Sequence, residues 1–179
     1  MKKRNLFIII LVIFLGVLIF FLTRKREINI FEFPDTLVVE NYTDNWLADT
    51  LSMVILNKIM GYDTINLKIY NKPTHINHSD YDIIGFVERN FFETNSYILY
   101  INNNLRFNDL KRFISHEMIH IDQLQRGDLI TFFSNYEYTI YKDDTIYFMK
   151  VPYKKRPFEV DAYRREREIL KKLNNLLYK

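Results

Sequence analysis

Residues 108–125, NDLKRFISHEMIHIDQLQ, have the clearest structural pattern in this 179-residue chain. Asn108 or Asp109 can cap the N-terminus of a helix here, and Gly127 suits the turn that ends one. At about 100° per residue, most of the apolar side chains share one stripe, while Ile119 points away from it. The stripe consists of Leu110, Phe113, Ile114, Ile121 and Leu124. This spacing predicts a helix that packs on a core.

The centre of the helix is an H-E-x-x-H pentapeptide, His116 to His120. Two histidines four residues apart lie on the same face of a helix and can bind one zinc ion. Glu117, between them, is placed to take a proton from a water molecule that the metal activates. Its side chain projects into the apolar stripe, where an unpaired carboxylate is costly. An amphipathic helix with two border histidines and a snorkelling Glu117 is the simpler alternative, but a purely structural helix would rarely place a carboxylate in its apolar stripe.

A catalytic zinc site needs a third protein ligand and an open position for water. No histidine follows His120, so the remaining candidates are acids, and the stretch RPFEVDAY at 156–163 offers two. In a helix that begins after Pro157, Glu159 shares a face with the apolar residues, and Asp161 lies about 200° around the axis. We therefore expect Glu159 to face the core as a ligand, and Asp161 to meet water or a neighbouring loop.

HEMIH on one helix and PFEVDAY at the start of a later one resemble the gluzincin metallopeptidases, and also small single-domain bacterial and phage zincins. The resemblance covers about residues 107–170. It implies a zincin-like fold, a zinc ion bound by His116, His120 and Glu159, and Glu117 as the general base that hydrolyses a peptide bond. Many gluzincins have an aspartate after the alanine to orient a zinc-bound histidine, whereas this chain has Tyr163 there.

Because of this departure, the residue that orients the histidines stays open among Gln123, Asp161 and Glu166. Tyr153 or Tyr163 could donate a hydrogen bond to the negative charge that develops on a substrate carbonyl. Ordinary packing is the simpler role for either, since the chain contains 13 tyrosines.

An uninterrupted apolar run, LFIIILVIFLGVLIFFL, occupies residues 6–22. As a helix it would span roughly 26 Å, close to the thickness of the hydrocarbon core of a bilayer. Bulky and charged residues follow it where signal-peptide cleavage requires small ones. The sequence predicts a transmembrane anchor over residues 1–26 and one domain over 27–179. The free amine before the run and Glu27 after it favour a cytoplasmic N-terminus, so we expect the domain outside the cytoplasm.

The charge distribution argues against nucleic acid as a partner. The whole chain has 25 basic and 22 acidic residues, but six of the basic ones flank the apolar run. The domain itself therefore has 19 basic residues against all 22 acids. A domain of net negative charge repels phosphate groups. We expect its partners to be a peptide or protein substrate and, through the anchor, the membrane.

The other segments alternate between strand and helix patterns. We expect strands at 28–40 with a break at Pro34-Asp35, and at 65–70, 82–88 and 96–101, a hairpin of 136–141 with 145–150, a helix from about 43 to 61, and a last helix from Pro157 nearly to the end. This order predicts an α+β domain, with a small mixed sheet packed on helices that include the H-E-x-x-H helix.

Two further expectations concern particular segments. The strand at 96–101 could offer an edge on which an extended peptide adds as another strand. His75 and His78 lie in a polar segment without an acid at ligand spacing, so they are expected to be solvated loop residues.

Two functions of different classes fit these patterns. One is a membrane-anchored zinc metallopeptidase. The alternative is a membrane-tethered binding protein that keeps the fold without useful turnover. Zinc content with and without hydrolysis of an unfolded protein would separate them.

Overall fold

The computed structural model describes residues 33–72, 85–102, 104–132 and 135–178, all of which belong to one compact unit, Phe33–Lys179. The predicted membrane segment at 6–22 lies outside the described residues, as do His75 and His78. Among the helices that are described, none combines the length and the hydropathy that a bilayer crossing requires.

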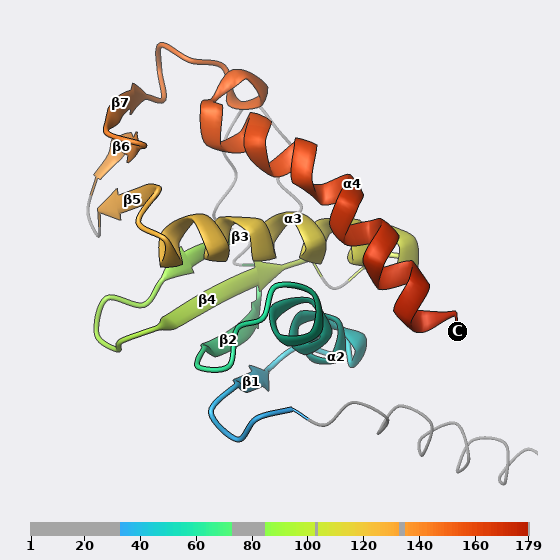
Figure 1. Ribbon diagram of the computed structural model, residues 1–179. Helices are drawn as coiled ribbons and strands as arrows, with labels where there is room; N and C mark the ends of the chain where they lie inside the picture. The colour runs from blue at the N-terminus through green and yellow to red at the C-terminus, as the bar shows by residue number, and fades with distance from the viewer. Residues whose placement is uncertain (1–32, 73–84, 103, 133–134, 179) are drawn as a thin grey trace, which may run out of the picture. The chain divides into compact units, whose positions relative to one another are not determined.

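Four strands form a mixed sheet in the order β1-β2-β4-β3 (Figure 1). β1, Val38–Asn41, is parallel to β2, Asn66–Asn71, and β2 is parallel to β4, Ser96–Ile101. β3, Gly85–Arg89, runs antiparallel to β4. The predicted α+β class with a mixed sheet is confirmed. The expected edge position of 96–101 is wrong, because β4 pairs with β2 on one side and with β3 on the other, which leaves β1 and β3 as the outer strands among those described.

Gly85 allows β3 to lie unusually close to its neighbours. A Cβ atom at this position would stand 2.0 Å from the backbone oxygen of Tyr100 on β4 and 2.6 Å from the ring of Phe113. Both distances are far shorter than any tolerated contact, so only glycine fits. The close approach brings the backbone of β3 against the helix that carries the H-E-x-x-H sequence.

That helix, α3, spans Phe107–Gln125 and lies between the sheet and α4, Pro157–Leu177 (Figure 1). It also contacts α2, Leu47–Met53. Every residue from Phe113 to Leu124 is buried. Ile119, which departs from the predicted stripe, is fully buried as well. Ile119 is buried although it lies outside the stripe, because other elements cover α3 on more than one side.

The predicted helix at 43–61 is shorter than expected and has two parts. α2 continues directly into a π-helical segment, η2, Val54–Ile59. Gly61 follows at a φ of +80°, the left-handed conformation that commonly ends a helix. The apolar spacing located this helix, but it contained no signal for the wider π-helical turn.

α4 begins with Pro157 in its first turn, as predicted, and a short 3-10 helix, η3, Tyr153–Lys155, precedes it. One face of α4 is buried and the other is solvated. The buried residues are Phe158, Glu159, Ala162, Glu166, Ile169 and Leu173. Two acids therefore lie among apolar side chains on the face that packs on α3.

A second, antiparallel sheet connects α3 to α4. It consists of β5, Leu129–Phe132, β6, Asn135–Tyr141, and β7, Asp144–Tyr147. The predicted hairpin is present, with Lys142 and Asp143 at positive φ in the two-residue turn that suits twisted strands. β5 was not predicted, and β7 ends earlier than 150.

Candidate metal centre

α3 presents the two histidines to one point. His116 and His120 are one helical turn apart, so their side chains emerge on the same face. Their Nε2 atoms lie 3.2 Å from each other. Both residues are buried, which distinguishes them from solvated histidines on a helix surface.

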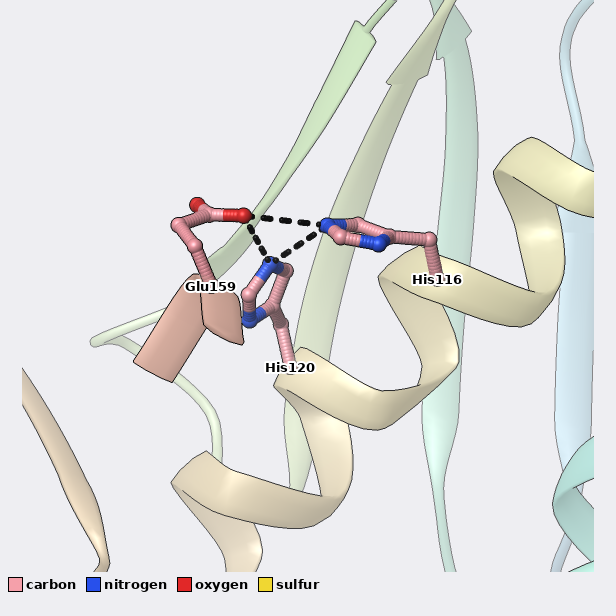
Figure 2. A group of neighbouring side chains, drawn as sticks. All are labelled: His116, His120 and Glu159. Atoms are coloured by element: carbon pink, nitrogen blue, oxygen red, sulfur yellow. Dashed lines mark hydrogen bonds and ion pairs between the residues drawn. The ribbon is translucent and has the colours of Figure 1, made fainter. Parts of the chain in front are cut away.

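The first turn of α4 brings Glu159 to the same point, as Figure 2 shows. Its Oε2 atom lies 3.1 Å from Nε2 of His116 and 3.5 Å from Nε2 of His120. Ligands at zinc-like bond lengths in tetrahedral geometry are about 3.3 Å apart. The three atoms therefore have the spacing of one face of a tetrahedron, and the group could hold a metal ion. All three side chains belong to residues that are 3–7% exposed.

Each histidine has a second partner at its Nδ1 atom. His116 Nδ1 lies 3.2 Å from Oε2 of Glu166, and the other oxygen of Glu166 accepts a 2.6 Å hydrogen bond from Arg112. His120 Nδ1 lies 2.8 Å from Oε1 of Gln123. Both Nε2 atoms are consequently turned inward. Of the three residues that the sequence left open, Glu166 and Gln123 contact the histidines directly.

Five residues thus make up what we call the histidine cluster: His116, Glu117, His120, Glu159 and Glu166. Its three carboxylates, when ionised, carry three negative charges, and the bound guanidinium of Arg112 offsets one of them. Buried charges in proteins are paired or coordinate metals. A divalent cation among the converging atoms would offset the other two.

The electrostatics favour positive charge at the centre of the cluster. Burial lowers the pKa of His116, but its hydrogen bonds to Glu159 and Glu166 overcome this effect and raise the pKa to about 10. Burial also opposes ionisation of Glu159, yet hydrogen bonds from His116 and His120 lower its pKa to about 2. The ionised carboxylate of Glu159 therefore faces two imidazoles. Positive charge between these three side chains, on a protonated histidine or a bound cation, is stabilised by the carboxylate.

Glu117 points toward the sheet rather than solvent. It is buried, as the sequence predicts, and its carboxylate accepts a hydrogen bond from the backbone N–H of Val87 on β3. Burial raises the pKa of Glu117 against the opposing influence of the charges on His120 and His116. Since a raised pKa brings a carboxylate closer to neutral pH, Glu117 is suited to accept and return a proton.

Two tyrosines contact the cluster in different ways. The hydroxyl of Tyr153, on η3, hydrogen-bonds to Glu159, and burial together with the charge of Glu159 raises the pKa of Tyr153. The phenol therefore stays protonated and is a donor. Tyr163 packs its ring against His116, with the ring centroids 4.6 Å apart. Tyr153 thus places its hydroxyl at Glu159, whereas Tyr163 places its ring against His116.

A second polar group lies between the same two helices, and we call it the arginine cluster: Tyr62, Asp122, Arg126, Asp161 and Arg165. Arg165 bridges the carboxylates of Asp122 and Asp161, and Arg126 also pairs with Asp122. Tyr62 donates its hydroxyl to Asp122. The side chain of Asp161 is only 11% exposed. The expectation that it meets water or a loop is therefore wrong, because arginines on its own helix and Gln123 cover it.

Sequence reasoning missed the arginine cluster. The mixed charges at 164–168 are typical of a solvated helix face, and Arg164, Arg167 and Glu168 do lie on such a face. Glu166 and Arg165 are the exceptions, and of these two only Arg165 belongs to the arginine cluster. Its position four residues after Asp161 was the available signal, since acid and arginine at this spacing can pair on a helix.

No family model, curated protein or solved structure matches this chain. The chemistry of the histidine cluster must therefore be inferred from its own residues.

Proposed function

We propose that this protein is a zinc-dependent hydrolase with a zincin-like fold, and that its reaction is the cleavage of peptide bonds. The observation that carries the proposal is the convergence of His116 Nε2, His120 Nε2 and Glu159 Oε2 at 3.1–3.5 Å, with the carboxylate of Glu117 buried beside them. Burial of so many ionisable groups at one point is costly, and a purely structural role for the helix does not require it.

The donor set favours zinc over other common metals. Two imidazole nitrogens and one carboxylate oxygen are ligands that zinc accepts, whereas calcium and magnesium prefer oxygen alone. His116, His120 and Glu159 would hold the ion. When bound, zinc would supply Lewis acidity, which makes water more acidic and polarises a carbonyl group.

Glu117 is the proposed general base. Its carboxylate would accept a proton from the attacking water and return it to the leaving amine. The N–H of Val87 holds this carboxylate in place, so its position does not depend on side-chain packing alone. Tyr153, a protonated phenol at Glu159, is the better placed of the two tyrosines to donate to an oxygen that gains negative charge.

A peptide substrate is favoured by the family resemblance and by β3. Among the described strands β3 is an edge of the sheet, and its backbone already contacts Glu117. An extended peptide that paired with this edge would be held by main-chain hydrogen bonds next to the general base. β3 replaces the strand at 96–101 in this role, because β4 has neighbours on both sides.

The proposal includes anchorage by residues 6–22, with the domain outside the cytoplasm. Anchorage rests on the seventeen-residue apolar run and its basic flanks. The full-length protein should remain in the membrane fraction after a carbonate wash. Release of a shortened chain that begins near residue 24 would instead show a cleaved signal peptide.

The decisive experiment is Glu117→Gln in the full-length protein. We expect the variant to retain zinc and to lose at least about a hundredfold in turnover, since general-base catalysis contributes on the order of 10² to 10⁴. Zinc content and the hydrolysis of a dye-labelled unfolded protein are the two measurements. Glu168→Gln, the same change on the solvated face of α4, is the matched control and should alter neither. Unchanged hydrolysis in Glu117→Gln would exclude the mechanism, and zinc without any hydrolysis in the unaltered protein would favour the tethered binding protein.

A further inference from the structure

Gln123 is a fully buried side chain that lies between the histidine cluster and the arginine cluster. Its Oε1 atom is 2.8 Å from Nδ1 of His120. Its Nε2 atom donates to the backbone oxygen of Phe158 and to Oδ2 of Asp161, each at 3.0 Å. All three contacts are short, so the amide is hydrogen-bonded at both ends.

The two partners of the NH₂ group decide which way this amide faces. A backbone carbonyl and an ionised carboxylate can only accept hydrogen bonds. Rotation of the amide by 180° would place its oxygen against both acceptors and its NH₂ group against His120. That orientation would set the buried amide oxygen against two oxygen acceptors with no proton between them, which is unfavourable. The oxygen of Gln123 therefore has to face His120.

The amide oxygen of Gln123 determines which ring nitrogen of His120 carries the proton. Because Oε1 can only accept, Nδ1 of His120 must carry the proton, and the lone pair of a neutral ring is then on Nε2. Nε2 is the atom that points at His116 and Glu159. The orientation of one amide is thereby transmitted to the atom that would bind the metal.

We propose that Gln123 is a positioning residue that holds His120 as the Nδ1–H tautomer, and that Asp161, through Gln123, tunes metal binding without touching the metal. The proposal rests on the proposed zinc site and deepens it. Asp161 is itself held by Arg164 at 2.7 Å and by Arg165, which also binds Asp122. The arginine cluster thus keeps in place the acceptor that orients Gln123.

A series of variants tests this order of contacts, with zinc affinity measured by competition against a chromophoric chelator. Gln123→Met keeps the size of the side chain and removes the acceptor, and should weaken zinc binding about 10–100-fold. Asp161→Asn retains an oxygen that can accept from Gln123 and should bind zinc within about threefold of the unaltered protein. Asp161→Ala should fall between these two, because Phe158 still accepts one hydrogen bond. Gln125→Met, the same change two residues further along α3, is the matched control and should leave the affinity unchanged.

A second measurement distinguishes a change in the protonation of the His120 ring from a general loss of structure. In metal-free protein labelled with ¹⁵N-histidine, the Nδ1–H proton of His120 should be visible and slow to exchange, since it is buried and hydrogen-bonded. It should disappear or exchange rapidly in Gln123→Met while remaining in Gln125→Met. Zinc affinity within about threefold of the unaltered protein in Gln123→Met, or an Nδ1–H signal that persists there, would overturn the proposal.

The two proposals fail in different ways. If the unaltered protein bound no zinc, the proposed function would be wrong, and the Nδ1–H measurement on the same protein would still decide whether Gln123 orients His120. If Gln123→Met failed to fold, the Asp161 pair would decide. Equal zinc affinities for Asp161→Asn and Asp161→Ala would exclude a role for the acceptor.

Discussion

The histidine cluster and the arginine cluster lie between the same two helices but satisfy their acids in opposite ways. In the arginine cluster, Asp122 and Asp161 face Arg165, and Arg126 gives Asp122 a second cation. In the histidine cluster, Glu159 faces two imidazoles, which are cationic only when protonated. The charge of an acid paired with arginine is already neutralised within the protein. Acids paired with histidine can exchange a proton for a metal ion, and this difference marks the second kind of site.

Helical phase separates the two clusters on α4. Glu159 and Glu166 are seven residues apart, almost two full turns, so both point at His116. Asp161 and Arg165 are four residues apart and point at Asp122 and Gln123. One helix therefore carries a proposed ligand face and a structural face, and Asp161 lies about 200° around the axis from Glu159.

The largest effect should follow from removal of the acid on the ligand face. Glu159→Ala should abolish stoichiometric zinc, because two neutral imidazoles remain without the carboxylate that completes the ligand set. Asp161→Ala, the matched change on the other face, should keep stoichiometric zinc under saturating metal, with only a modest loss of activity. Metal analysis after gel filtration measures both. The reverse ranking would show that the division between the two faces is wrong.

The next effect concerns the acid that orients His116. Glu166→Ala removes the acceptor at Nδ1 and should weaken zinc binding about 10–100-fold. Glu168→Ala, on the solvated face of the same helix, should leave it unchanged. Chelator competition gives both affinities. Equal affinities in the two variants would mean that Glu166 serves only its ion pair with Arg112.

The pH dependence of stability should distinguish histidine from arginine as a partner. In chelator-treated protein, the raised pKa of His116, about 10 against a usual 6.5, stabilises the fold fully below pH 6.5 and loses this contribution as the pH rises toward 10. The lowered pKa of Glu159, about 2 against a usual 4.5, stabilises the fold above pH 4.5 and loses its contribution as the pH falls toward 2.

Thermal unfolding of the chelator-treated protein should therefore show Tm falling between about pH 6.5 and 9. Zinc-loaded protein should lack this decline, since metal binding strengthens as the histidines lose their protons. His116→Gln should remove much of the slope in the metal-free protein. A Tm that did not vary with pH in the chelator-treated protein would contradict the assigned coupling between His116 and Glu159.

The smallest effect is expected at the far side of the arginine cluster. Tyr62→Phe removes one hydrogen bond to Asp122, which keeps its two arginines, so unfolding should become easier by about 1 kcal/mol with zinc content unchanged. Tyr42→Phe removes a comparable hydrogen bond to Glu40 on the surface and should cost less. Chemical denaturation resolves the two. Loss of zinc in Tyr62→Phe would mean that the clusters are more strongly coupled than Gln123 alone explains.

Local patterns were sufficient for the elements that carry the site. α3 ends at the predicted Gln125, but the predicted caps are wrong, because the helix begins at Phe107 with Arg106 as its N-cap and Asn108 and Asp109 lie inside the first turn. The phase of α4 alone distinguished Glu159 from Asp161, because both helices are regular and the projection holds over a few turns. The strand at 96–101 has the predicted bounds.

The features that the sequence did not predict depend on how helices and strands pack against one another. The edge position of β3 follows from strand order, which no local pattern encodes. Periodicity indicates that one face of α3 is apolar, but not that several elements enclose it, so Ile119 remained unexplained. The choice among Gln123, Asp161 and Glu166 required the packing of α3 on α4. A projection of each helix alone cannot show which side chains of the two helices touch.

The enclosure of α3 has a consequence for how quickly a bound ion could leave. Backbone amides in a helix covered on several sides exchange with solvent only when much of the domain opens, whereas the first turn of a helix can open locally. His116 and His120 lie in the protected middle of α3, and Glu159 lies in the first turn of α4. The three proposed ligands therefore divide into two histidines on a protected part of a helix and one glutamate on a segment that can open locally. Brief opening of the segment that begins at Pro157 would govern the lifetime of the bound ion. The two histidines would keep their positions during this opening.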